Sequence, residues 1–218
     1  MTEEEKSQIV EGTTYRYSSD WIHNLESEQH WRLYWRQQKL MEGLVLKGHS
    51  VLEIGVGSGF AANYLRSKGV EVTTIDIDEG KNPDIISNIV TYDFPDKYDH
   101  IMAFEVFEHI PFNQLEQLLR KLGQSCRQYL FMSVPRNERV VFQFMCKLPK
   151  IRKLAYDLRI KKGRINARHH FWEIGHGQIS LSSLRWVLRE AGFTPIEEDK
   201  FFSLCFFAFR TRIDCQEK

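Results

Sequence analysis

The sequence lacks the features of membrane-spanning proteins, of disulfide-rich proteins and of strongly basic nucleic-acid-binding proteins. No apolar run approaches the roughly 20 residues that span a bilayer. The four cysteines are far apart and form no Cys-x-x-Cys pair, which argues against a disulfide framework or a thiolate metal site. The net charge of +1 gives no bulk attraction to nucleic acid. Residues 1–6 are acidic and no apolar stretch follows them, so we expect no signal peptide and a cytoplasmic protein with reduced thiols.

The remaining composition predicts one globular domain with a small addition. With 218 residues, 42% hydrophobic and 27% charged, the chain is long enough for a full core. Residues 1–19 are polar and have no regular pattern, whereas residues 20–46 carry apolar residues at helical spacing. We therefore expect residues 1–46 to form an N-terminal helical lid. Residues 47–218 form the main domain. Within it, 136–168 is a basic insert that we expect to be irregular or helical.

The main domain alternates short apolar strands with helices. We expect strands at 50–54, 70–75, 85–90, 100–106 and 128–134, and helices at 58–67, 113–122 and 180–191. Two closing strands, 194–198 and 201–210, are separated by two residues, which suits a hairpin. The pattern predicts an α/β fold with a doubly wound, mostly parallel sheet of seven strands, the last of them antiparallel.

A glycine-rich loop follows the first of these strands. In the segment 51–59, apolar residues run into Gly55, Gly57 and Gly59, and a helix comes next. Glycine permits positive φ and lets a ligand lie against the backbone, while the helix N-terminus offers free N–H groups. Asp76 ends the next strand, where a carboxylate would accept the hydroxyls of a ribose. Glu53 suits a ligand with a cationic amino group, whereas nicotinamide-binding loops have a different glycine spacing and no such acid.

These residues resemble the first motif of class I S-adenosylmethionine-dependent methyltransferases, which have a Rossmann-like fold. The resemblance covers about 50–211. It implies that the glycines, with Val56 between them, wrap the methionine part of the cofactor and that Asp76 holds its ribose. It also implies that Ile77 packs on the adenine and that Asn88 and Ile89 lie at the adenine edge.

A second motif, Glu105-x-x-Glu108-His109, follows the fourth strand. A helical turn there would project the three side chains to one side, at the carboxyl end of the sheet where such folds bind ligands. Two carboxylates and an imidazole suit Mn, Fe(II) or Zn, and Mg less well. Alternatively, Glu105 hydrogen-bonds the cofactor, Glu108 caps a turn and His109 acts as a base.

The second motif is similar to one in small-RNA 2′-O-methyltransferases and in quinone-pathway O-methyltransferases. The former resemblance implies a further ligand from the segment 168–175, either His169 or His170, and we select His170. Glu105, Glu108, His109 and His170 would then hold a metal ion that binds neighbouring ribose hydroxyls and lowers the pKa of the one that is methylated. Without a metal, His109 or His170 is the candidate general base.

The basic insert leaves several partners open. Its positive charge suits the phosphates of RNA or of a nucleotide-sugar, or an anionic membrane surface. The same charge is also compatible with a solvated helix that covers the substrate cleft.

We expect methyl transfer to an oxygen or nitrogen of a small-molecule acceptor, with or without a metal ion. The alternatives are a metal-dependent RNA ribose 2′-O-methyltransferase and a non-catalytic S-adenosylmethionine-binding subunit. The sequence does not indicate an oligomeric state.

Overall fold

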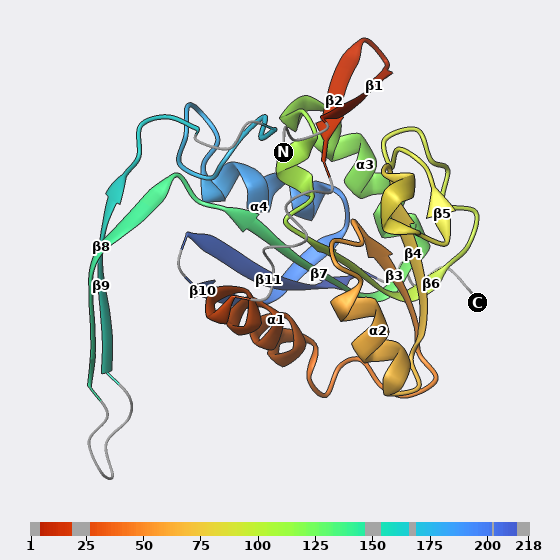
Figure 1. Ribbon diagram of the computed structural model, residues 1–218, viewed down its shortest axis with the longest axis horizontal. Helices are drawn as coiled ribbons and strands as arrows, with labels where there is room; N and C mark the ends of the chain where they lie inside the picture. Colours follow the sequence, from red (N-terminus) through yellow and green to blue (C-terminus); the bar gives the residue numbers. More distant parts are fainter. Residues whose placement is uncertain (1–4, 19–26, 147–153, 166–168, 202, 213–218) are drawn as a thin grey trace.

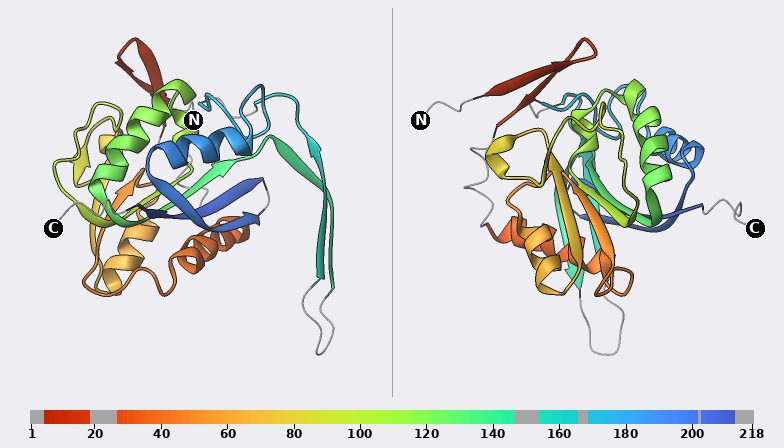
Figure 2. Two further views of the ribbon diagram at one scale, coloured as in Figure 1. Left: turned by 180° about the vertical axis from the view of Figure 1, so that it is seen from behind. Right: turned by 90° about the vertical axis from the view of Figure 1, so that its right-hand side faces the viewer.

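The computed structural model describes residues 5–18, 27–146, 154–165, 169–201 and 203–212. It consists of a central sheet with helices on both faces, a small N-terminal hairpin and a long two-stranded ribbon that leaves the body (Figures 1 and 2). Within the described residues, no helix has the length and apolar character needed to cross a bilayer.

The central sheet has seven strands in the order β10-β11-β7-β6-β3-β4-β5. All neighbouring pairs are parallel except those that involve β11, which runs antiparallel to β7 and β10. This confirms the predicted doubly wound sheet with its antiparallel last strand. The strands are β3 (Ser50–Ile54), β4 (Glu71–Asp76), β5 (Ile85–Ile86), β6 (Tyr98–Phe104), β7 (Cys126–Pro135), β10 (Phe193–Phe201) and β11 (Leu204–Thr211).

Helices α1 (Glu28–Met41) and α2 (Phe60–Ser67) cover one face of the sheet, and α3 (Phe112–Ser125) and α4 (Leu181–Glu190) cover the other (Figure 2). Successive strand residues point to opposite faces, so Val51 packs with α1 and α2, while Leu52 packs with α3 and α4. Each fully buried side chain of this kind contributes about 1.5–3 kcal/mol. The sheet therefore has two apolar layers that hold its carboxyl ends in place.

Two predicted boundaries were wrong for identifiable reasons. The third strand ends at Ile86 because Asn88 forms a turn, in which its side-chain oxygen accepts from Val90 N and its carbonyl accepts from Thr91 N. Helix α3 continues past Gly123 to Ser125. A Cβ at Gly123 would lie 2.6 Å from the carbonyl oxygen of Ala191, so this glycine permits close packing and does not end the helix.

The N-terminal region is not the irregular segment that we expected before its helix. Strands β1 (Lys6–Val10) and β2 (Thr13–Tyr17) form a hairpin that precedes α1. Its turn consists of Glu11 and Gly12 with φ of 49° and 77°, the left-handed pair that suits a two-residue hairpin. Tyr15 is buried and donates to Gln114 Oε1, which fixes the hairpin to α3. Residues 20–26, part of the predicted helical segment, and residue 19 lie outside the described residues.

The described part of the basic insert is extended, so the expectation of an irregular or helical segment was wrong. Strands β8 (Glu138–Cys146) and β9 (Leu154–Lys161) pair antiparallel. The β-branched and aromatic residues of β8 favour a strand, and the apolar residues of β9 alternate with polar ones over 158–161. Residues 147–153 and 166–168 of the insert lie outside the described residues.

Candidate active site

A cavity of about 600 Å³ opens at the carboxyl ends of β3, β4 and β6. Its wall combines the glycine loop, the end of β4, the segment after β6, the loop that contains His170, and parts of the N-terminal hairpin and α1. Ligands of open α/β sheets bind at this edge. Of the predicted residues, Gly59 is not part of the lining, which includes Glu53, Gly55, Val56, Gly57, Asp76, Ile77, Asn88, Ile89, Glu105, Glu108, His109 and His170.

The backbone conformation of the glycine loop requires glycine at three positions. Gly55, Gly57 and Gly59 have φ of 80°, 54° and 74°, in the region that other residues rarely adopt. The N–H of Gly55 donates to the carbonyl of Ile75 at 2.9 Å, and Gly59 caps α2. A Cβ at Gly55 would lie 2.6 Å from Cγ2 of Val106. The loop therefore passes too close to the turn after β6 to accommodate a side chain.

We expect Gly55→Ala to lower the free energy of unfolding by roughly 3 kcal/mol, because it adds overpacking to backbone strain. Gly48→Ala is the matched control: its φ is 81°, but a Cβ there meets no atom within 4 Å. The control should lose only about 1 kcal/mol. Denaturant unfolding measures both. Adding Val106→Ala should restore part of the loss in Gly55→Ala, and equal losses in the two glycine variants would contradict the close approach.

Asp76 joins the glycine loop to the end of β4. Its carboxylate accepts the N–H groups of Val56 at 2.9 Å and Asp78 at 2.8 Å. Lys81 Nζ lies 3.1 Å from Oδ2 and 3.4 Å from Oδ1 of Asp76. Lys81 was not predicted from the sequence, because no motif relates it to Asp76; the short helix η2 (Glu79–Lys81) brings it back to the strand end.

Glu53 is buried beside the loop. Only 5% of it is exposed, and its Oε2 has no hydrogen-bond partner among the described residues. Burial raises the pKa of the Glu53 carboxyl to about 8, although the positive charge of Arg66 acts in the opposite direction. The carboxyl is therefore largely protonated at neutral pH and gains from a cationic partner.

The turn after β6 differs from the helical turn that we predicted. Glu105 has a φ of 57°, and its N–H donates to the carbonyl of Ser133 at 3.0 Å, which extends the ladder between β6 and β7. Only Phe107–His109 are helical, as the short helix η3. Glu105 therefore does not share a helical turn with Glu108 and His109. Its side chain is accessible from the cavity, and desolvation by the surrounding wall raises its pKa to about 7.

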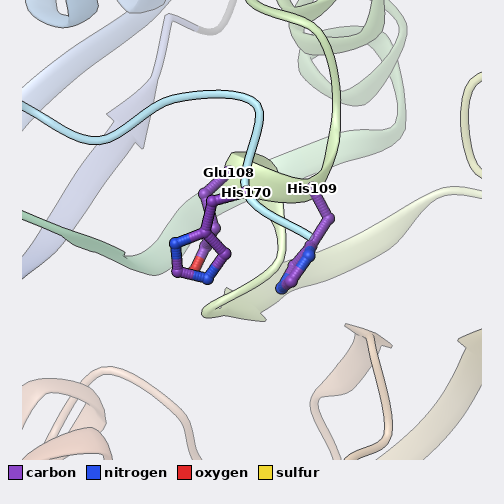
Figure 3. Close-up of side chains that lie close together, drawn as sticks. All are labelled: Glu108, His109 and His170. Atoms are coloured by element: carbon purple, nitrogen blue, oxygen red, sulfur yellow. The ribbon is translucent and has the colours of Figure 1, made fainter. Parts of the chain in front are cut away.

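Glu108, His109 and His170 lie together at the cavity wall (Figure 3). One potential ligand atom from each lies within 4.8 Å of the others. Glu108 is 1% exposed, and neither carboxylate oxygen has a hydrogen-bond partner among the described residues. Desolvation, then the charge of Glu105, raises the pKa of Glu108 well above its usual value. Glu105 lies outside this group.

Both imidazoles of the group are held by their Nδ1 atoms. His109 Nδ1 lies 3.1 Å from the carbonyl oxygen of His169, and His170 Nδ1 lies 3.2 Å from Glu173 Oε1. Because these oxygens accept, each Nδ1 carries the proton and each Nε2 keeps a lone pair. Burial lowers the pKa of His109 to about 4 and also lowers the pKa of His170, so both rings are neutral at neutral pH.

Two supporting residues were missed by the sequence analysis. Glu173 is 2% exposed, and its other oxygen accepts from Asn137 Nδ2 at 2.8 Å. The spacing of His170 and Glu173 was a usable signal, whereas Asn137 comes from the start of the ribbon and had none. His169 also lines the cavity, but its Nδ1 lies 3.7 Å from Glu5 Oε1 and it is not part of the group with Glu108.

Aromatic side chains from α1 and α2 complete the wall. Tyr34 stacks on Phe60 with ring centroids 4.4 Å apart, and its hydroxyl lies 2.9 Å from Ser58 Oγ. Tyr34 and Phe60 both line the cavity. The cavity lining thus includes aromatic rings as well as titratable groups.

Comparisons with known proteins agree with this architecture. Residues 17–198 match a family model described as a methyltransferase domain. Magnesium protoporphyrin IX methyltransferase from Synechocystis PCC 6803, solved with bound SAM, is similar in fold, with a TM-score of 0.57, 16% identity, and 88% of this chain and 84% of that chain covered. The N-methyltransferase NodS from Bradyrhizobium japonicum WM9 gives a TM-score of 0.58 at 13% identity, with 86% and 98% covered.

A curated relative matches over a shorter stretch. (S)-coclaurine N-methyltransferase from Thalictrum flavum subsp. glaucum is 35% identical over 94 residues. The match covers 35% of this chain and 26% of the relative, so the chain spans about a quarter of that protein's length. The family match over most of the chain decides the assignment: this protein belongs to the family described as a methyltransferase domain, and its fold is that of solved S-adenosylmethionine-dependent methyltransferases.

Proposed function

We propose that this enzyme transfers the methyl group of S-adenosylmethionine to an oxygen or nitrogen atom of a small-molecule acceptor held beside His109 and His170. The observation that carries the proposal is the pair of neutral imidazoles at the cavity wall, each held by Nδ1 so that Nε2 keeps its lone pair. The names of the similar proteins, acting on coclaurine and on magnesium protoporphyrin IX, support a small-molecule acceptor.

The cofactor would occupy the part of the cavity nearest the glycine loop. Gly55 and Gly57, with Val56, would surround its methionine part, and Asp76 would accept the ribose hydroxyls. The adenine would lie against Ile77, with Asn88 and Ile89 at its edge. Glu53 would face the amino group, because its buried carboxyl gains most from a positive charge.

The chemistry needs alignment and one proton transfer. The bond between sulfur and the methyl carbon breaks as the bond from the acceptor atom to that carbon forms, and S-adenosylhomocysteine leaves. The acceptor's proton passes to Nε2 of His109 or His170, because both rings are neutral near pH 7; the pKa of about 4 makes His109 a weaker base than an ordinary imidazole. Much of the rate enhancement comes from holding the two reactants in line.

The role proposed for Glu53 predicts how many protons are released when the cofactor binds. At pH 7 its carboxyl is largely protonated, because its pKa is about 8. Pairing with the cofactor's ammonium favours the ionised form, so binding should release close to one proton. Calorimetric titrations with S-adenosylhomocysteine in buffers of different ionisation enthalpy measure this number. Glu53→Gln should bind without proton release, and an unchanged release in that variant would contradict the pairing.

As an alternative use of the same Nε2 lone pairs, we propose that Glu108, His109 and His170 bind a divalent metal ion, in which case neither imidazole is the base. The donor set fits, because the two unpartnered, buried oxygens of Glu108 face two imidazoles whose Nε2 atoms are available. The contact between His170 and Glu173 is the carboxylate–histidine pair that supports metal ligands. Mn, Fe or Zn suits mixed oxygen and nitrogen donors better than Mg. A bound ion would lower the pKa of an acceptor hydroxyl.

Metal content tests this second proposal without an assay of activity. Equilibrium dialysis against Mn²⁺ or Zn²⁺, followed by elemental analysis, should find one ion per chain. Glu108→Gln should lower the affinity by roughly 10- to 100-fold or more, since it removes an anionic ligand. Glu116→Gln, on the exposed side of α3, is the control and should bind as the wild type does. Absence of a stoichiometric ion in the wild type would refute the metal site.

Label transfer tests the main proposal. The protein is incubated with methyl-tritiated S-adenosylmethionine and separate small-molecule, RNA and protein fractions of a cell extract. We expect label in the small-molecule fraction. Label in RNA 2′-O-methyl groups would favour the RNA ribose methyltransferase instead, and cofactor binding with no labelled product would favour the non-catalytic subunit.

A further inference from the structure

The ribbon formed by β8 and β9 presents an apolar face to solvent. It extends away from the central sheet (Figures 1 and 2). Phe142 is paired with Leu158, so these two residues share a face. Phe144 and Ile160 each lie two residues further along a strand and join that face. The four side chains, with exposed fractions of 55%, 47%, 48% and 45% respectively, form what we call the ribbon's apolar face.

Positive charge accompanies this face. Arg139 is paired with Ile160 in the ribbon, and Arg139, Lys161 and Arg164 are exposed. Segment 138–164 contains nine Lys or Arg against two Asp or Glu, whereas the rest of the chain has 21 against 27. The molecule is therefore polarised, with a basic ribbon and an acidic body. A negatively charged surface would attract the ribbon and repel the body, and so would orient the protein.

We infer that the ribbon binds the interface of a membrane that contains anionic lipids, with its apolar face among the acyl chains and its basic residues at the headgroups. Apolar side chains beside Lys and Arg form the combination that such interfaces bind. Two of the four side chains, Phe142 and Phe144, have rings on which a nucleobase could stack, whereas Leu158 and Ile160 are aliphatic, so the face as a whole suits acyl chains better than RNA. Two ribbons would repel one another, because both carry the same charge.

Sedimentation with vesicles tests the inference on the whole protein. We expect binding to phosphatidylcholine vesicles with about one-third phosphatidylglycerol and little binding to pure phosphatidylcholine, because each basic residue near an anionic surface adds about fivefold. Phe142→Ser with Phe144→Ser should weaken binding by about tenfold or more. Arg139→Gln with Lys161→Gln should weaken it by a similar factor and reduce its salt dependence.

Trp186→Ser with Ile196→Ser is the matched control, because it removes two exposed apolar side chains from α4 and β10. It should bind vesicles as the wild type does. Equal vesicle binding by the Phe142/Phe144 variant and the wild type would overturn the inference, as would equal binding to charged and neutral vesicles. A dimer in sedimentation velocity that the same variant abolishes would assign the face to a second copy. RNA binding lost in that variant, without vesicle binding in the wild type, would assign it to RNA.

Discussion

His109→Ala lowers kcat for methyl transfer by roughly 10²- to 10⁴-fold, the usual contribution of a positioned general base. The side chain is held by the carbonyl of His169 and its ring is neutral, so the variant loses a group that is positioned to accept a proton, although its pKa of about 4 makes it a weaker base than an ordinary imidazole. The affinity for S-adenosylhomocysteine should stay within about threefold of the wild type, because His109 is assigned to the acceptor side. Initial rates of label transfer and calorimetry measure the two quantities.

His176→Ala is the control for this variant. His176 belongs to the same loop region as His170 but does not line the cavity. Its rate should match that of the wild type. A His109→Ala enzyme that keeps a rate within tenfold of the wild type would remove His109 from the mechanism, and the same experiment with His170→Ala would then decide whether the other imidazole is the base.

Asp76→Ala weakens S-adenosylhomocysteine binding by about 100-fold. Two charge-assisted hydrogen bonds to ribose hydroxyls, at about 1.5 kcal/mol each, amount to roughly 3 kcal/mol. The loss of affinity is not expected to be larger, because three of the roughly four acceptor positions of this carboxylate are already used by Val56 N, Asp78 N and Lys81 Nζ. One ribose hydroxyl can bind beside Lys81, and the second requires Lys81 to move. Calorimetric titration measures the change.

Asp84→Ala is the matched control for Asp76→Ala. Asp84 also binds β4, through the N–H and hydroxyl of Thr74, but it lies outside the cavity. Removing the Asp84 carboxylate should lower the free energy of unfolding and leave the affinity for S-adenosylhomocysteine unchanged. If Asp76→Ala bound S-adenosylhomocysteine as tightly as the Asp84→Ala variant does, the ribose assignment would be wrong.

The fold was predictable where local pattern and tertiary packing agree. Val51 and Leu52 are buried on opposite faces of β3, so a run of apolar residues was the correct signal for a central strand. The ribbon was not predicted because the basic residues of the insert were interpreted as the charged face of a helix. The alternation in 158–161 and the β-branched residues of β8 are the signals that indicate strands. The N-terminal hairpin was missed because its turn, Glu11-Gly12, is a weaker sequence signal than Asn-Gly.

The candidate site was predictable only where its residues are close in sequence. The glycine loop and Asp76 lie at the ends of adjacent strands, and the strand order alone brings them together. The contact between Lys81 and Asp76 depends on how η2 folds back, and the contact between Asn137 and Glu173 joins segments 36 residues apart. Glu105 departed from the predicted turn because its N–H pairs with β7, a tertiary hydrogen bond that no spacing rule contains.

The proposed enzyme binds S-adenosylmethionine in the cavity beside the glycine loop, through Asp76. Calorimetric titration of the wild-type protein with S-adenosylhomocysteine, and separately with NAD⁺, decides whether it does. We expect one saturable site per chain for S-adenosylhomocysteine, weakened by Asp76→Ala, and no heat with NAD⁺. Saturable binding of NAD⁺ with no heat from S-adenosylhomocysteine would contradict this assignment.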